Sequence, residues 1–185
     1  LYPATYDLDK EKTAEAVVSE MVAKTKTEIE NAGIDLDDAN RIMTLASLVE
    51  IESPGDEDVR KKVARVFLNR ISDDSKTGKL LQSDATVAYI HGARSDLTTT
   101  KEERQSDSPY NTYKQKGLPP GPINSPSSGA VDAALNPTEG DWQFFVATNP
   151  DTGETKFADT FDEHRKNVEI YRKWLKEHNE GNGDG

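Results

Sequence analysis

The chain contains no cysteine, so disulfide bonds and thiol catalysis are excluded. No apolar run approaches the roughly 20 residues that a membrane-spanning helix needs, and no signal peptide is visible. Only three histidines occur, at His91, His164 and His178, and they show no paired metal-ligand spacing. The histidines therefore give no indication of a metal site.

Basic residues are also scarce relative to acidic ones, 23 against 34, which gives a formal net charge of −11. That balance argues against nucleic acid or an anionic membrane surface as a partner. With 185 residues the chain can form one domain with a sizeable core. It begins at Leu1 without a methionine, so we expect an excised fragment of a longer protein.

Hydrophobic periodicity predicts a mostly helical α+β fold. Helices are expected over about residues 9–31, 36–52, 56–71, 83–91, 128–136 and 162–178. Asp35 is expected to cap the second helix and Gly33 to end the first. Aromatic and β-branched residues over 142–148, a turn at 149–153 and a return over 156–158 predict a small antiparallel sheet. The glycine-rich tail, 181–185, is expected to be disordered.

A loop over residues 110–126 is rich in proline and glycine and contains Tyr110, Asn111 and Tyr113. Proline fixes φ and glycine adopts conformations that other residues avoid, so the loop is stiff and non-repetitive. Composition alone slightly favours a structural Ω-loop packed on its own side chains. The alternative is a binding loop held in place by a rigid scaffold.

Two further segments carry candidate chemistry. Glu50 ends an otherwise apolar helix, where a half-buried carboxyl group retains a proton near neutral pH and can serve as a general acid. The alternative for Glu50 is a solvated glutamate in a last helical turn, whereas Glu52 is expected to point elsewhere on the helix. Gln82, Ser83 and Asp84 precede or begin a short helix. Ser83 or Asp84 suits an N-cap, and the amide of Gln82 suits sugar hydroxyls and N-acetyl groups.

These motifs, taken together and in order, resemble the endolytic murein transglycosylases of the YceG-like, or MltG-type, family. The matching segments are residues 46–52, 63–70, 81–87, 108–113, 117–123, 133–137 and 144–147, followed by Phe157, Thr160, His164 and Asn167. The likeness covers nearly the whole chain. It departs from the family pattern at Ile51, at Ala85 and over the loosely matched residues 92–107, which puts substrate-length preference in more doubt than activity.

The resemblance implies a lysozyme-like catalytic core, with residues 1–8 ending a LysM-like portion, 9–180 forming the transglycosylase domain and 181–185 a tail. It also implies cleavage of the β-1,4 bond between N-acetylmuramic acid and N-acetylglucosamine within nascent peptidoglycan strands. The products carry 1,6-anhydromuramic acid ends, which terminates elongation. Implied partners are glycan strands and peptidoglycan synthases, at the extracytoplasmic face of a bacterial membrane reached through an N-terminal anchor absent from this sequence.

The resemblance places the catalytic glutamate at Glu50. One carboxyl group suffices because the sugar's own C6 hydroxyl attacks, whereas ordinary glycosidases use two. The implied chemistry calls for no metal and no organic cofactor. The residues expected to bind substrate are Gln82, Ser83, Asp84, Tyr110, Asn111 and Tyr113. Tyr110, Asn111 and Tyr113 are expected to face Glu50 across one groove. A non-catalytic peptidoglycan-binding module and a scaffold of the cell-wall synthesis machinery are the alternatives to an enzyme.

Overall fold

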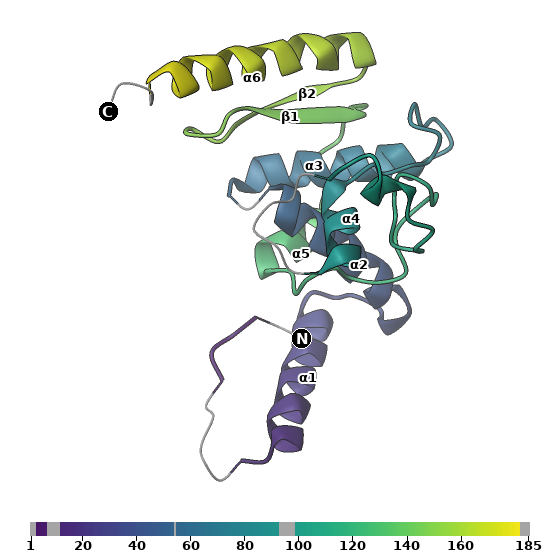
Figure 1. Ribbon diagram of the computed structural model, residues 1–185. Coiled ribbons are helices and arrows are strands. Elements are labelled where there is room, and N and C mark those ends of the chain that lie inside the picture. Colours follow the sequence, from purple (N-terminus) through teal and green to yellow (C-terminus); the bar gives the residue numbers. More distant parts are fainter. Residues whose placement is uncertain (1–2, 7–11, 54, 93–98, 182–185) are drawn as a thin grey trace.

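The computed structural model describes residues 3–6, 12–53, 55–92 and 99–181. Within them the fold is α+β and mostly helical, with one two-stranded sheet, as predicted (Figure 1). In chain order the elements are α1 (Ala14–Asn31), α2 (Leu36–Glu52), α3 (Glu57–Ile71), α4 (Asp84–His91), the 3₁₀-helix η1 (Glu103–Gln105), α5 (Ser128–Leu135), β1 (Phe144–Asn149), β2 (Glu154–Ala158) and α6 (Phe161–Gly181). None of the helices in the described residues combines the length and apolar character that crossing a bilayer requires.

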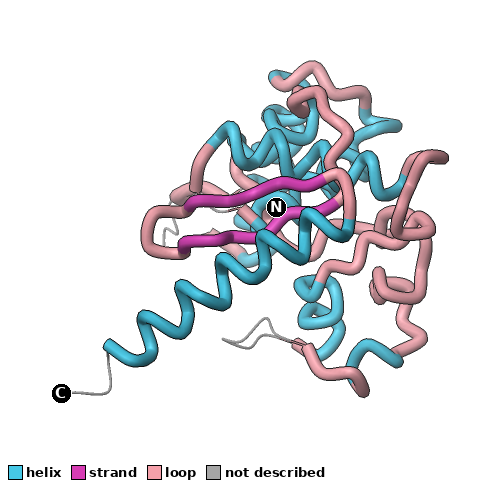
Figure 2. The backbone as a smooth tube through the Cα atoms, turned by 90° about the horizontal axis from the view of Figure 1, so that it is seen from above, coloured by secondary structure: helices cyan, strands magenta, loops and turns pink. Residues whose placement is uncertain are grey.

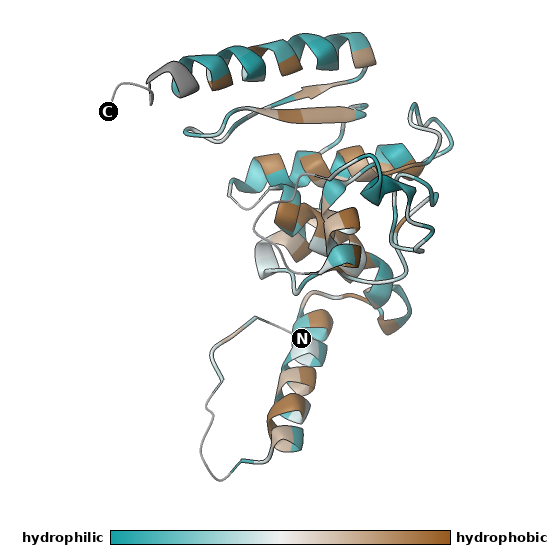
Figure 3. Ribbon diagram, in the orientation of Figure 1, coloured by the Kyte–Doolittle hydropathy of each residue, from teal (hydrophilic) through white to brown (hydrophobic). Residues whose placement is uncertain are grey.

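Helix α2 is the centre of the core. Asp35 caps it by accepting a hydrogen bond from the backbone N–H of Asp37 at 3.0 Å, as predicted. Every residue from Thr44 to Val49 is buried, and α2 packs against α3, α4 and α5. Figure 3 shows the contrast between the second half of α2, which is mainly hydrophobic, and α6, which is mostly hydrophilic.

The two helices beside α2 begin at capping side chains. Asp56 accepts a hydrogen bond from the N–H of Val59 and begins α3, and Ser127 accepts one from the N–H of Ala130 and begins α5. Both helices start within one residue of the predicted position. Because α5 contains mainly small residues on its buried side, it lies close to α2 and α3.

The sheet and α6 form a separate layer. Strands β1 and β2 pair antiparallel, with Phe144 opposite Ala158, and α6 runs across the hairpin (Figures 1 and 2). The start of α6 is fixed by two reciprocal hydrogen bonds: the N–H of Thr160 donates to Glu163, and the N–H of Glu163 donates to the Thr160 hydroxyl. The layer rests on α3, where the rings of Phe67 and Phe145 meet edge to face at 6.1 Å.

Helix α1 points away from this body (Figure 1). It begins at Ala14, not near residue 9, because the Thr13 hydroxyl accepts a hydrogen bond from the N–H of Ala16 and so fixes the first turn. Gly33 follows its C-terminus with φ of +68°, as the sequence predicted.

The predicted domain boundaries remain predictions, since residues 7–11 and 182–185 lie outside the described ranges. Gly181 closes α6 and does not begin the tail. The likeness of the core to lysozyme also stays a prediction.

Candidate active site

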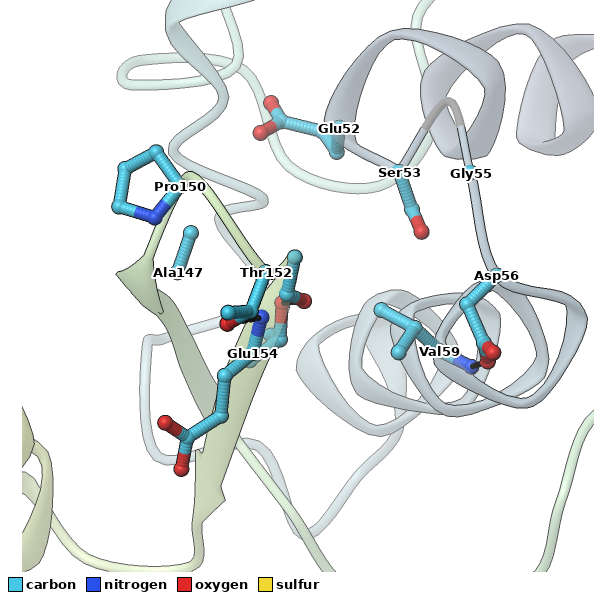
Figure 4. Close-up of a pocket in the computed structure, with 11 residues that line it drawn as sticks. Glu52, Ser53, Gly55, Asp56, Val59, Ala147, Pro150, Thr152 and Glu154 are labelled. Atoms are coloured by element: carbon cyan, nitrogen blue, oxygen red, sulfur yellow. Dashed lines mark hydrogen bonds between the residues drawn. The ribbon is translucent and has the colours of Figure 1, made fainter.

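Glu52, at the last position of α2, lies where two cavities meet. The larger cavity has a volume of about 580 Å³ and lies between the loop joining α2 to α3 and the turn of the β-hairpin. Figure 4 shows Glu52 leaving the end of α2 on the side where Ala147 and Pro150 of the hairpin lie. The smaller, of about 300 Å³, lies between the start of α4 and the start of α6. Together we call these two cavities the groove.

The carboxyl group of Glu52 is held by one hydrogen bond. The hydroxyl of Ser83 donates to Oε1 at 2.8 Å. Among the described residues, Oε2 has no hydrogen-bond partner. Burial raises the pKa of Glu52, and the bond from Ser83 and the positive charge of Arg70 offset part of that rise. Glu52 thus has the properties of a group that holds and releases a proton.

Arg70, on α3, is the buried cation beside Glu52. Its Nε donates to the carbonyl of Gln143 at 2.7 Å, and its Nη1 donates to the carbonyl of Leu81. Burial lowers the pKa of Arg70 to about 10, and the negative charge of Glu52 acts in the opposite direction. Arg70 therefore stays protonated at neutral pH. It ties the hairpin layer and the start of α4 to the same point on α3.

Gln82 lines the smaller cavity with an exposed side chain, where the sequence placed a substrate-binding amide. Its φ is +54°, a left-handed conformation that is uncommon for a residue other than glycine. The N–H of Gln82 donates to the carbonyl of Thr112, and the N–H of Ser83 donates to the Thr112 hydroxyl, both at 3.1 Å. The strained backbone is thus fixed by the neighbouring loop, an arrangement often found at functional sites.

Tyr113 and Asp84 form a pair in the same cavity. The phenol of Tyr113 donates to Oδ1 of Asp84 at 2.9 Å, and Arg104 contacts that oxygen at 2.9 Å. Burial raises the pKa of Tyr113, and the bond to Asp84 adds to the rise. The phenol therefore stays protonated. Asp84 has its oxygens occupied by Tyr113, Arg104 and Thr99, so it orients Tyr113 instead of being free for a substrate.

Ser83 also differs from expectation. It occupies the N-cap position of α4, yet its side chain makes no capping bond because the hydroxyl donates to Glu52 instead. Four of the six residues expected to bind substrate therefore gather in one cavity. These are Gln82, Ser83, Asp84 and Tyr113.

Glu50 is placed differently from the prediction. Its Oε2 accepts hydrogen bonds from the N–H of Ser127 at 3.0 Å and from the Ser127 hydroxyl at 2.5 Å. Arg60 lies 3.9 Å from Oε1, and a Cβ on Gly129 would come within 2.6 Å of the Arg60 guanidinium. Glu50 joins α2 to α5 and lines neither cavity of the groove. The expectation that Glu50, not Glu52, faces the predicted binding residues is wrong.

Asn111 is also structural. It is completely buried, its side-chain amide donates to the carbonyls of Arg104 and Ser106, and its Oδ1 accepts from the N–H of Tyr113. With every polar group of the amide used inside the loop, the expectation that it meets the substrate is wrong.

Tyr110 lies outside the groove as well. Its ring packs on Tyr89 at 5.0 Å, and a Cβ on Gly121 would come within 3.2 Å of its hydroxyl. The prediction that Tyr110 and Asn111 share one groove with the catalytic glutamate is therefore wrong. The alternative of a structural loop holds for this part of residues 110–126.

Several groove residues were given no role by the sequence. They are Arg70, Phe144, Phe145, Phe161 and His164. Arg70, Phe144, Phe145 and His164 lay in matched motifs, which was the available signal. The last three lie about 90 or more positions from Glu52 along the chain, which hid their proximity to it. The described residues hold no group of three or more histidines or carboxylates disposed to bind a metal ion.

Comparison with known proteins identifies one family and relatives that share one name. The model of the YceG-like family matches residues 1–170. A Bacillus subtilis protein named endolytic murein transglycosylase is 36% identical over 176 residues, covering 92% of this chain and 47% of its own length. A Streptococcus pneumoniae protein of the same name is 35% identical over 179 residues, covering 91% of this chain and 31% of its own length.

A solved structure agrees. The crystal structure of a YceG-like protein from Listeria monocytogenes matches with a TM-score of 0.72 and 37% identity. The match covers 90% of this chain and 53% of that one. The chain thus spans about half or less of the length of these relatives.

Proposed function

The chain belongs to the YceG-like family, and from that premise we propose that it carries the catalytic site of an endolytic murein transglycosylase. The reaction proposed is cleavage of the β-1,4 bond between N-acetylmuramic acid and N-acetylglucosamine within peptidoglycan strands. It leaves 1,6-anhydromuramic acid ends and so stops strand elongation. The observation that carries the proposal is a partly buried glutamate, Glu52, that lines both cavities of the groove, whereas Glu154 lines only the larger one and is exposed.

We assign the catalytic role to Glu52 instead of Glu50. Glu52 lies in the groove with a raised pKa, and its Oε2 has no hydrogen-bond partner among the described residues. A general acid needs both properties, because it must hold a proton near neutral pH and present it to the substrate. Glu50 is less able to present a proton to a substrate, since Ser127 donates two hydrogen bonds to one of its oxygens and Arg60 lies 3.9 Å from the other.

In the proposed reaction, protonated Glu52 donates its proton to the glycosidic oxygen as the bond from that oxygen to C1 breaks. The C6 hydroxyl of the same muramic acid then bonds to C1, and its proton passes to the Glu52 carboxylate. The atoms balance without water, and Glu52 ends protonated. Ser83 keeps the carboxyl group in position, while Arg70 limits the rise of its pKa so that both steps are accessible.

The form of the groove supports cleavage inside a strand. Cavities extend on both sides of Glu52, so sugar residues can be bound before and after the bond to be cut. Gln82 and the phenol of Tyr113 supply neutral polar groups on the side of the smaller cavity. Such groups suit hydroxyl and N-acetyl substituents and can support the charge that develops at C1.

The test is digestion of uncross-linked glycan strands followed by mass spectrometry of the products. The proposal expects new anhydromuramic acid ends from the wild-type protein, formed about 10²–10⁴-fold more slowly by Glu52→Gln. Strand binding without anhydro ends from the wild type would instead identify the alternative, a non-catalytic peptidoglycan-binding or scaffold module.

Location and partners form part of the same proposal. Murein lies outside the cytoplasm, so we place the activity at the extracytoplasmic face of the bacterial membrane. Peptidoglycan synthases are the proposed protein partners, since they produce the strands to be cut. Cross-linking in bacterial cells, followed by identification of the captured proteins, tests this part independently of the reaction.

A further inference from the structure

Phe161, the first residue of α6, is the exposed aromatic side chain of the groove. It is 60% exposed, yet it lines the smaller cavity together with Glu52. Exposed apolar side chains are ordinary when they occur singly on a surface, but those inside a cavity with convergent polar groups often contact a ligand. The position of Phe161, not its exposure alone, calls for an explanation.

The ring of Phe161 packs against two neighbouring rings, those of Phe144 and His164. It meets Phe144 at 5.8 Å in an edge-to-face arrangement, and His164 stacks on Phe144 at 5.3 Å with an interplanar angle of 22°. The backbone of Phe161 is fixed by the reciprocal bonds between Thr160 and Glu163. Three rings from β1 and α6 therefore form a preorganised aromatic surface beside Glu52, which we call the aromatic platform (Phe144, Phe161 and His164).

The platform presents no full charge of its own near neutral pH. Burial lowers the pKa of His164, and the positive charge of Arg70 lowers it further, so the imidazole is neutral. The guanidinium of Arg165 lies 6.0 Å from the centre of the Phe161 ring, at the limit of a cation–π contact, and Phe161 remains exposed.

We propose that Phe161, supported by Phe144 and His164, binds a sugar ring of the glycan strand and holds it against the smaller cavity next to Glu52. The inference rests on the proposed function and names one of its binding positions. The face of an aromatic ring is electronegative and matches the C–H groups on the face of a sugar ring. The polar rim supplied by Gln82 and Tyr113 then contacts the substituents of that sugar.

A matched pair of substitutions on α6 tests the inference. Phe161→Ala removes the platform's exposed ring, whereas Ile170→Ala removes an apolar side chain that is 45% exposed on the same helix but lines neither cavity of the groove. With uncross-linked glycan strands as substrate, Phe161→Ala is expected to raise KM about tenfold, the equivalent of losing one aromatic stack and its apolar contact. Phe161→Trp is expected to restore KM, and Ile170→Ala to leave it unchanged.

Thermal melts of the three variants separate binding from folding. Since the Phe161 side chain is mostly exposed, the Tm of Phe161→Ala is expected to match that of Ile170→Ala. An unchanged KM for Phe161→Ala, or an equal rise for Ile170→Ala, overturns the inference.

The two proposals fail in different ways. If the wild type makes anhydro ends and Phe161→Ala does so with the same KM, the transglycosylase stands and the platform is wrong. If the wild type makes no anhydro ends but Phe161→Ala weakens its binding to isolated glycan strands about tenfold, the platform stands and the proposed reaction is wrong.

Discussion

Glu50 and Glu52 are separated by one residue, but their surroundings differ in what they leave for a ligand. Glu50 has its carboxylate filled by Ser127 and Arg60 at the junction of α2, α3 and α5, whereas Glu52 faces the groove with one oxygen unpartnered among the described residues. At 3.6 residues per turn, positions two apart lie about 200° around a helix. The comparison teaches that saturation of a carboxylate by its own protein marks a structural role.

The loop repeats this division. The side-chain amide of Asn111 forms hydrogen bonds with the backbone of Arg104, Ser106 and Tyr113, whereas the side chain of Tyr113 lies in the groove. Residues with a structural role and residues available to bind a substrate thus lie only two positions apart in this loop.

The strongest way to break the comparison is to exchange each glutamate for glutamine. Glu52→Gln is expected to lower the rate of anhydro-product formation by about 10²–10⁴-fold, because the amide cannot transfer the proton. Glu50→Gln is expected to stay near wild-type activity in the folded fraction. Product yields by mass spectrometry, normalised to folded protein, measure both activities. A lower activity for Glu50→Gln than for Glu52→Gln would show that Glu50 is the general acid.

The next largest effect is expected for Asn111→Ala. The substitution leaves two partly buried carbonyl groups and one N–H without their partner, so it should reduce the free energy of unfolding by about 2–4 kcal/mol. Urea denaturation measures this, with Gln115→Ala as a control because that side chain is exposed and the residue's hydrogen bond comes from its backbone. If Asn111→Ala kept full stability but lost activity, Asn111 would belong to the groove after all.

A smaller loss of stability is expected for Glu50→Ala. It removes the acceptor for two hydrogen bonds of Ser127 and the charge facing Arg60, which should cost about 1–3 kcal/mol. Glu57→Ala, at an exposed ion pair with Lys61, serves as the control and should change stability by less than about 0.5 kcal/mol. Equal melting temperatures for the two variants would show that Glu50 does not hold the helix junction.

The smallest effect concerns pH. The pKa of Glu52 is raised in the folded state, so its favourable contribution is complete below the ordinary glutamate pKa and is lost as pH rises through the raised value. Glu52→Gln lacks this loss and should gain stability relative to the wild type as pH increases from about 4 toward neutrality. Denaturation curves across that range measure the difference, and a decline in the relative stability of Glu52→Gln would contradict a raised pKa.

Much of the fold could be predicted from local signals. Asp35, Asp56 and the turn after Asn149 specify element ends through contacts between near neighbours, and the structure has these ends close to where the sequence placed them. The start of α1 was harder to predict. The helical pattern continues on both sides of Thr13, so the sequence did not show that Thr13 caps the helix.

The site was predictable only in part. Gln82, Ser83 and Tyr113 were found through motifs, but the choice between Glu50 and Glu52 failed because every residue of α2 from Thr44 to Val49, just before these glutamates, is buried. Hydrophobic periodicity shows which side of a helix faces solvent only where polar residues lie on one side. A stretch that is apolar on all sides therefore does not show which of the following residues face a groove. Phe161 lies more than 100 positions from Glu52, and only the packing of α6 on the hairpin brings the two together.

One wall of the groove, including Phe144 and Phe161, comes from a single continuous stretch near the end of the chain, the β-hairpin followed by α6. Such a stretch can open as a cooperative unit at a lower free energy than global unfolding. Amide hydrogens of β1 should then exchange with solvent before those of buried α2. The lifetime of the assembled groove is therefore set by the local opening rate of this layer, so heating should abolish activity while the helical body is still folded.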